Sequence, residues 1–191
     1  MIDAAERIAA EQGLAAMSLR AVQAAAGQRN KSAAQYHFGT REGLVEAVLV
    51  ARMSPINERR LDLLVELDAS APLRAWVEVL VRPVAEAVLG APESHWARFV
   101  MAGSADPSIA EIVRTNLASR AFRTARERAL AQLGSLPART RARRFDQAVS
   151  LLFLTLAGVE AASTRPSRAE AERIVEDLIN VCTAVLQAPA A

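Results

Sequence analysis

The stretch that decides the fold spans residues 18–49 and reads SLRAVQAAAGQRNKSAAQYHFGTREGLVEAVL. Ser18 can cap a short helix that Gly27 ends, and a polar turn then leads into a second short helix over residues 31–38. After a further glycine, Thr40 is a natural N-cap for a longer helix. Two short helices separated by a turn that starts with glycine are typical of a helix-turn-helix, whose second helix can enter the major groove of DNA.

The charges around this stretch favour contact with DNA. No Asp or Glu occurs between Gln12 and Arg41, although the chain holds 21 acidic residues. Acidic side chains would repel the phosphates of DNA, so a surface that faces DNA is expected to come from a stretch of sequence without Asp or Glu. The net charge of the whole chain is only +2, so the prediction rests on this local distribution.

The composition predicts a chain that is helical almost throughout. Alanine, the best helix former, supplies 41 of the 191 residues, whereas Gly and Pro supply 8 each. Apolar residues recur at helical spacing, and no alternating pattern indicates a strand. We therefore expect an all-α fold of about nine helices, with a break or kink at Ser54-Pro55 and one unbroken helix from Pro107 to about Leu133.

The composition also excludes several classes of protein. With 52% hydrophobic residues the chain is too apolar to be disordered, and its single cysteine excludes a disulfide scaffold or a multi-cysteine zinc site. Charged residues interrupt the N-terminal segment where a signal peptide would be apolar, and the longest nearly apolar stretch, residues 148–159, is too short to span a bilayer. We expect a cytoplasmic protein without membrane contact, metal site or cofactor.

A more specific motif follows the helix-turn-helix. Tyr36-His37-Phe38 is followed by Gly39-Thr40 and then by Arg41-Glu42-Gly43-Leu44. This series resembles the N-terminal DNA-binding domain of TetR-family transcriptional regulators, in which an aromatic-His-Phe motif precedes a short polar turn and a Lys/Arg-Glu-x-Leu helix start. The turn at Gln28-Arg29-Asn30 is one residue longer than in most members of that family. The resemblance covers about the first fifty residues.

The resemblance implies two domains and a function. Residues 1–50 are expected to form a three-helix helix-turn-helix domain, and residues 51–191 a helical effector-binding and dimerisation domain. The expected protein is a repressor that binds a palindromic DNA operator as a homodimer and is released by an unknown small-molecule effector. A ligand-independent DNA-binding protein on the same fold is the alternative. An all-α enzyme or interaction domain is less favoured, because the chain has two histidines and no Ser/His/Asp or metal-ligand spacing.

Ten residues of the first domain are candidates for DNA contact. On the second short helix, Lys and Gln side chains can reach base edges, and Tyr can reach a phosphate or a thymine methyl group. Residues at turns and helix starts are better placed to contact phosphates. A solvated helix face is the alternative for the helix residues, and packing between helices is the alternative for the histidine. The candidates are Ser18, Arg20, Arg29, Asn30, Lys31, Ser32, Gln35, Tyr36, His37 and Arg41.

Two further sets of apolar residues are candidates for a ligand pocket and a dimer interface. The resemblance implies a ligand cavity among the middle helices, where half or more of the apolar residues can be ordinary core. The candidates for its lining are Trp76, Leu80, His95, Trp96, Phe99, Val100, Phe122 and Phe153. The last two helices carry more apolar surface than one buried side requires. They predict a two-fold four-helix interface through Phe145, Val149, Leu152, Leu156, Ile174, Leu178, Val181 and Val185.

A second basic run and the single cysteine remain. Residues 114–144 contain nine Arg and one acid, Glu127. We expect these arginines to form a solvated face or to pair with the acidic residues of the last helix, and an anionic effector is the alternative. Cys182 is expected to be a small buried residue, with redox sensing as the alternative.

Overall fold

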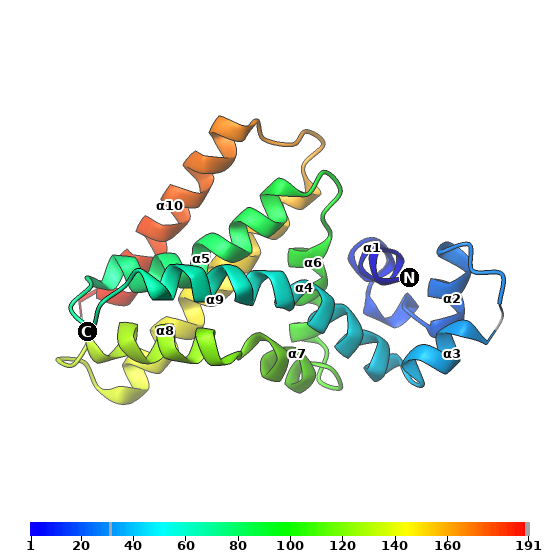
Figure 1. Ribbon diagram of the computed structural model, residues 1–191, viewed down its shortest axis with the longest axis horizontal. Coiled ribbons are helices and arrows are strands. Elements are labelled where there is room, and N and C mark those ends of the chain that lie inside the picture. Colours follow the sequence, from blue (N-terminus) through cyan, green and yellow to red (C-terminus); the bar gives the residue numbers. More distant parts are fainter. Residues whose placement is uncertain (31, 190–191) are drawn as a thin grey trace.

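The computed structural model describes residues 1–30 and 32–189, which contain ten α-helices, one short 3-10 helix and no strand (Figure 1). The expected all-α fold is therefore confirmed for the part of the chain described. The helices are α1 (Ile2–Gln12), η1 (Leu14–Ala16), α2 (Leu19–Ala25), α3 (Ala33–Phe38), α4 (Arg41–Val65), α5 (Leu73–Gly90), α6 (Trp96–Ala105), α7 (Ala110–Leu117), α8 (Arg120–Ala131), α9 (Ala138–Ala161) and α10 (Arg168–Gln187).

Helix α4 is shared by two groups of helices. Its 25 residues extend for about 37 Å, from the small group α1–α3 into the larger group α5–α10 (Figure 1). Leu44 and Val48 are buried in its first half, close to α1 and α3, whereas Met53 and Ile56 are buried in its second half, which packs against α5, α7 and α8. The domain boundary expected at residue 50 therefore falls inside one helix.

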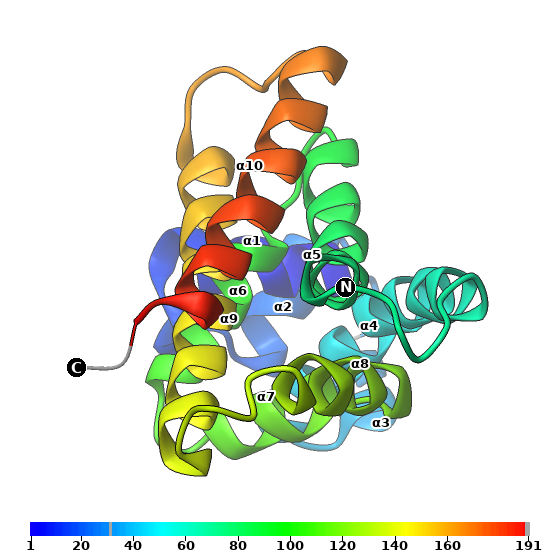
Figure 2. The same ribbon diagram turned by 90° about the vertical axis from the view of Figure 1, so that its left-hand side faces the viewer.

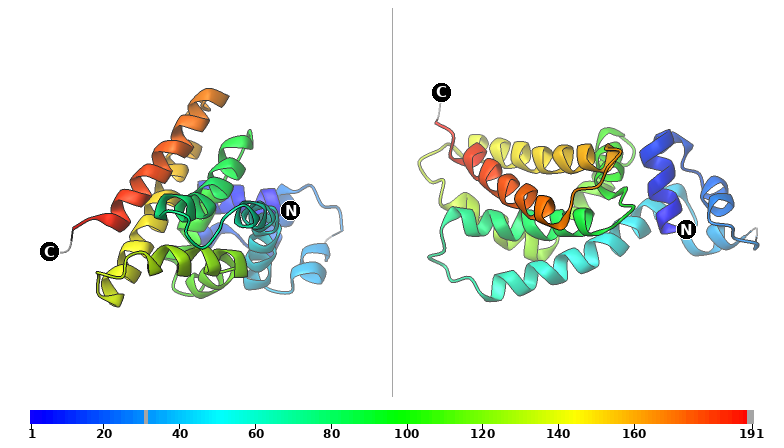
Figure 3. Two further views of the ribbon diagram at one scale, coloured as in Figure 1. Left: turned by 60° about the vertical axis from the view of Figure 1, so that its left-hand side comes forward. Right: turned by 90° about the horizontal axis from the view of Figure 1, so that it is seen from above.

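The larger group of helices encloses most of the apolar core. Helix α10 packs against α5 and α9, and α5 also packs against α8 and α4 (Figures 2 and 3). The core is continuous through both groups, from Ile8 and Val22 to Leu156 and Ile179. Among the helices described, none combines the length and the apolar character that crossing a bilayer requires.

The two expectations about helix breaks have different outcomes. Helix α4 continues through Pro55, so of the break or kink expected at Ser54-Pro55 the break does not occur. The segment from Pro107 to Leu133 is not one helix but two, because the chain leaves the helical conformation at Ala118 and Ser119. There the Ser119 hydroxyl accepts a hydrogen bond from the amide of Phe122 at 3.1 Å and caps α8.

Polar contacts tie the small group of helices to the large one. Arg52 of α4 donates to both carboxylate oxygens of the buried Glu6 in α1, at 2.7 and 2.9 Å. Arg98 of α6 donates to the carbonyl of Ala10 in α1. Glu160, near the end of α9, accepts hydrogen bonds from the first amides of α6, so α9, α6 and α1 form a connected series of contacts.

Replacing Glu160 is expected to loosen this connection. Its carboxylate accepts from the amides of Ala97 and Arg98 at 3.0 and 2.9 Å and from the Ser94 hydroxyl at 2.6 Å. Because Glu160→Ala leaves these donors without an acceptor at a helix N-terminus, we expect a loss of about 1.5 kcal/mol in the free energy of unfolding, measured with urea. Glu160→Gln keeps one oxygen and should lose about half as much.

The matched control is Glu58→Ala, since Glu58 is an exposed residue of α4 for which no side-chain hydrogen bond occurs within the described residues. Its effect should stay within about 0.5 kcal/mol. Equal effects of Glu58→Ala and Glu160→Ala would contradict the role assigned to Glu160.

Candidate functional site

Local sequence signals set the geometry of the helix-turn-helix. The hydroxyl of Ser18 accepts a hydrogen bond from the amide of Ala21 at 3.1 Å and so caps α2. The chain turns away from α2 at Gly27, whose φ of +63° is in the left-handed region that favours glycine. Before α3, the Asn30 side chain accepts from the amide and hydroxyl of Ser32 at 3.1 and 2.9 Å. Helix α3 packs against both α2 and α4.

One face of α3 is open to solvent. Ala33 and Ala34 are buried against the domain, whereas Gln35, Tyr36 and His37 are exposed, and Tyr36 has 86% of its surface accessible. The rings of Tyr36 and His37 meet edge to face, with centroids 5.4 Å apart. A large aromatic side chain that remains this exposed on one protomer is suited to contact another molecule.

The other candidates for DNA contact fall into three groups. Ser18, Arg20, Arg29, Asn30 and Ser32 are exposed near the ends of α2 and α3. Lys31 lies outside the described residues. Several candidates also make contacts inside the protein: Gln35 donates to the carbonyl of Gly39 at 2.6 Å, Ser18 caps α2, and Asn30 accepts from Ser32.

Arg41 has a different position from the one expected. Its guanidinium donates to the carbonyl of Leu14 at 3.0 Å and lies 3.4 Å from the carboxylate of Asp106 at the end of α6. Hydrogen bonds from Ser108 and the pairing with Arg41 hold the pKa of Asp106 below its ordinary value. Arg41 therefore links the small group of helices to α6 rather than extending freely toward a phosphate.

The start of α4 approaches the end of α3 very closely at Gly43. The Thr40 hydroxyl accepts from the Gly43 amide at 3.0 Å and caps α4. A Cβ atom at residue 43 would lie only 2.2 Å from the carbonyl oxygen of Phe38. The absence of a side chain at this position therefore sets the position of α3 relative to α4.

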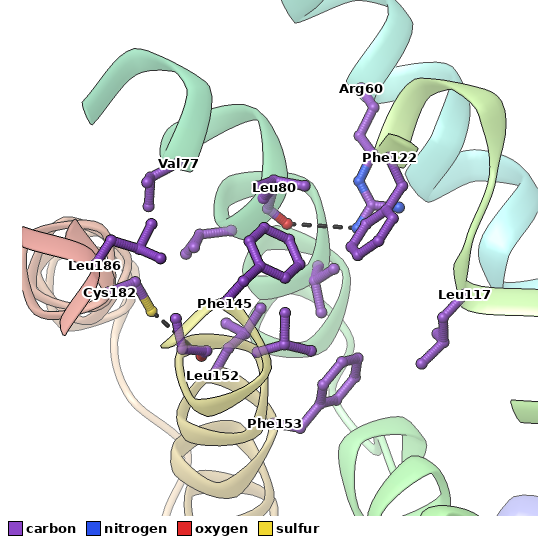
Figure 4. Close-up of a pocket in the computed structure, with 14 residues that line it drawn as sticks. Arg60, Val77, Leu80, Leu117, Phe122, Phe145, Leu152, Phe153, Cys182 and Leu186 are labelled. Carbon is purple, nitrogen blue, oxygen red and sulfur yellow. Dashed lines mark hydrogen bonds between the residues drawn. The ribbon is translucent and has the colours of Figure 1, made fainter. Parts of the chain in front are cut away.

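A narrow, mostly apolar cavity lies between α4, α5, α7, α8, α9 and α10 (Figure 4). The cavity has a volume of only about 50 Å³. A ligand larger than a few water molecules therefore needs the surrounding helices to move apart. The walls are formed mainly by Val77, Leu80, Val84, Leu117, Phe122, Phe145, Val149, Leu152, Phe153 and Leu186.

The structure places three of the eight predicted pocket residues at this cavity, namely Leu80, Phe122 and Phe153. Trp76 instead donates from Nε1 to the carbonyl of Ala71 at 3.0 Å. Trp96, Phe99 and Val100 are buried in α6, and the rings of Trp96 and Phe99 are stacked with centroids 6.0 Å apart. His95 lies beside Glu11 of α1, with 3.5 Å between Nε2 and Oε1. These five residues do not line this cavity, so their role in binding a ligand stays a prediction.

The sequence interpretation missed Arg60, the one charged residue of the cavity wall. Arg60 is only 3% exposed, although arginines at helical surfaces are ordinarily solvated. The available sequence signal was its position four residues after Ile56 on the buried face of α4. Cys182 is buried as expected and also lines the cavity, and burial raises the pKa of its thiol to about 11.

The predicted dimer interface needs a correction. Phe145, Leu152, Leu156 and Leu178 are buried in the core of the protomer itself, so their side chains are not available to a second chain. Val149, Ile174 and Val185 are partly buried, whereas Val181 is 39% exposed. Leu154 of α9, which was not predicted, is 60% exposed. The error has a simple cause: helical spacing identifies an apolar face but not the surface that it covers.

The basic run of residues 114–144 also differs from expectation. The acids of α10 pair with α5 instead, since Arg82 contacts Glu172 and Glu176 and Arg74 contacts Glu176. Several arginines of the run bind the protein itself: Arg126 lies over the ring of Phe145 at 5.1 Å, and the buried Arg144 donates to the carbonyls of Leu186 and Pro189 at 3.3 and 2.7 Å. Arg120, Arg139 and Arg143 are exposed, in agreement with a solvated face.

Comparisons with known proteins agree with this arrangement. Residues 1–48 match the family model described as bacterial regulatory proteins, tetR family. The structure is similar to AmtR from Mycobacterium smegmatis, with 19% identity, a TM-score of 0.60 and coverage of 95% of this chain and 84% of that chain. It is also similar to PfmR from Thermus thermophilus, a TetR-family transcriptional regulator, with 18% identity, a TM-score of 0.58 and coverage of 100% of this chain and 98% of that chain. At these identities the likeness establishes the fold. No curated protein is similar enough to this sequence to count as a relative.

Proposed function

We infer that this chain, which belongs to the TetR family of bacterial regulatory proteins through its N-terminal domain, binds a palindromic DNA operator as a homodimer and represses transcription until a small molecule releases it. The observation that carries the proposal is the open face of α3 with Tyr36 at its centre. It supports a role in binding rather than in catalysis.

The surface around α3 has the chemistry of a DNA-binding surface. Gln35 and Tyr36 are exposed on the helix, and Arg20 and Arg29 are exposed on the neighbouring α2 and turn. No acidic residue occurs between Gln12 and Arg41 to oppose phosphates. In this arrangement α3 enters the major groove, where polar side chains read base edges, and the arginines contact the backbone.

A homodimer is supported by the apolar surface that α9 and α10 leave exposed. Leu154 and Val181 lie on these two helices, which pack against each other, and both side chains are exposed on a single protomer. In a two-fold dimer that binds a palindromic operator, the two copies of α3 must reach successive major grooves on one side of DNA, which are about 34 Å apart.

Release by a ligand is supported by the position of α4. This helix forms part of the cavity wall at Arg60 and continues without interruption to Thr40, where it contacts α3. A ligand that moves α4 therefore also moves α3. The ligand can lower the affinity for DNA only by as much as its own affinity differs between the DNA-binding conformation and the displaced one. The alternative, a regulator that responds to no ligand, keeps the same DNA surface.

The test starts with the selection of bound duplexes from a random library by the wild-type protein, because the operator is not known. We then expect Tyr36→Ala to weaken binding to the selected duplex about tenfold at fixed salt, measured by fluorescence anisotropy, because a groove contact of this kind contributes roughly 1–3 kcal/mol. The matched control is Val65→Ala, which removes a side chain that is 87% exposed at the far end of α4 and should leave binding unchanged.

Three outcomes bear on the separate parts of the proposal. Equal affinities of Tyr36→Ala and wild type would exclude α3 as the reading helix. A monomeric protein at micromolar concentration would exclude the homodimer. If selection repeated with a library of small molecules never releases the duplex, the ligand-independent alternative is favoured.

A further inference from the structure

The cavity contains a positive charge that the protein does not neutralise. Arg60 enters it from α4 and its guanidinium lies over the ring of Phe122, with 5.4 Å to the ring centroid (Figure 4). Among the described residues, no Asp or Glu lies within salt-bridge distance of Arg60. Burial without an opposite charge lowers the pKa of Arg60 to about 10.

The hydrogen bonds of Arg60 leave one edge of its guanidinium available. Nη1 donates to the side-chain oxygen of Asn57 at 2.9 Å, and this oxygen also accepts from the Ser119 hydroxyl at 2.7 Å. Nη2 makes only a long contact of 3.4 Å with the carbonyl of Leu80, and Nε is buried without any acceptor. The Nε–Nη2 edge is the part of a guanidinium that holds a carboxylate through two parallel hydrogen bonds.

Such a group is unusual as a purely structural feature. A buried charge is ordinarily paired, because removing it from water is unfavourable by several kcal/mol. Here the neighbours that line the cavity are apolar, apart from Cys182, whose raised pKa keeps it a neutral thiol at neutral pH. Because no carboxylate of the described residues pairs with the guanidinium of Arg60, we infer that its partner is an anion from outside the chain.

The charge and shape of the cavity restrict that partner further. Among the residues that the structure describes, Arg60 is the only cation of the wall, so a dianion such as a phosphate monoester would leave a second buried negative charge unpaired. The remaining wall is formed by aliphatic and aromatic side chains, among them Leu80, Phe145 and Leu152. The site thus combines a single point of charge with an apolar surface.

We propose that the cavity binds a molecule with one carboxylate on an apolar body, whose carboxylate pairs with the Nε–Nη2 edge of Arg60. This proposal rests on the proposed function in one respect: such a molecule is the effector that releases DNA. Because the empty cavity is narrow, the apolar body must separate α8 and α9 from α4, and the ion pair holds α4 in the separated position.

The experiment compares acids with alcohols of the same shape on the full chain without DNA. Octanoate is compared with 1-octanol, and 4-phenylbutanoate with 4-phenyl-1-butanol, by isothermal titration calorimetry. For at least one pair, we expect the wild-type protein to bind the acid ten times more tightly than the alcohol or better. Arg60→Met should remove this preference. The control is Arg59→Met, which changes the neighbouring exposed arginine that pairs with Glu86 and should keep the preference.

Two results would overturn the proposal: neither acid binds more tightly than its alcohol, or Arg60→Met retains the preference of the wild type. The wild-type comparison decides the matter by itself if the variant does not fold. Because ligand binding is measured without DNA, its failure leaves operator binding as an independent result. Conversely, an acid that binds at Arg60 and leaves operator affinity unchanged would contradict the release step of the proposed function and not the site.

Discussion

The variant Gly43→Ala is expected to lose operator binding almost entirely while the larger group of helices stays folded. The new Cβ atom would lie 2.2 Å from the carbonyl oxygen of Phe38, so the end of α3 must move by about 1 Å to reach an ordinary contact distance. Hydrogen bonds to bases tolerate only a few tenths of an ångström. We therefore expect the affinity for the selected duplex to fall about a hundredfold, a loss of roughly 2.7 kcal/mol, measured by fluorescence anisotropy.

The control for this variant is Gly90→Ala. Gly90 is the last residue of α5, and a Cβ atom there meets nothing within 4 Å. Its operator affinity should equal that of the wild type, and its far-UV circular dichroism should match that of Gly43→Ala. An affinity of Gly43→Ala within threefold of wild type would show that α3 can move without losing its contacts, and would contradict the role given to Gly43.

The variant Arg60→Met is expected to be more stable than the wild type in the absence of ligand. Burial lowers the pKa of Arg60 to about 10, which corresponds to about 3 kcal/mol of destabilisation. At neutral pH the guanidinium of Arg60 is protonated in both the folded and the unfolded state, so the destabilisation is fully present. Above pH 10 the folded state loses this proton before the unfolded state does, and the free energy of unfolding therefore rises with pH. The bonds to Asn57 and Leu80 offset part of the destabilisation, and we expect a net gain of about 2 kcal/mol.

Urea unfolding at pH 7 and at one fixed protein concentration measures this gain, because a dimer unfolds in a concentration-dependent way. The control Arg59→Met removes an exposed ion pair and should change the free energy of unfolding by less than about 0.5 kcal/mol. A destabilisation by Arg60→Met would mean that Arg60 is a structural residue, satisfied by its bonds within the protein. In that case the guanidinium of Arg60 would need no anionic partner in the cavity.

The helix-turn-helix was largely predictable because its signals are local. Ser18 and Thr40 cap the helices that the sequence assigned to them, and Gly27 ends α2 in the left-handed conformation. Each of these signals acts within four residues along the chain. The exception is Arg41, whose partner Asp106 is 65 residues away and belongs to another part of the fold, at the end of α6.

The larger group of helices was predictable only as a set of apolar helices. Helical spacing showed that Phe145 and Leu152 are buried, but a dimer partner and the protomer's own core bury a side chain equally well. The structure assigns both residues to the cavity wall. The break at Ser119 was missed for a related reason, since a serine in a helical pattern is compatible with both a cap and a continuous helix.

The sequence by itself determined that this chain is helical and that its first fifty residues form a helix-turn-helix, because helix caps and glycines act between neighbours in the chain. Only the tertiary structure decided where the cavity lies and which residues line it. The cavity is formed by six helices distributed between residues 60 and 186, and the isolation of Arg60 is a property of their packing. Whether a buried charge is paired depends on all the neighbours that surround it in space, and these are far from it along the chain.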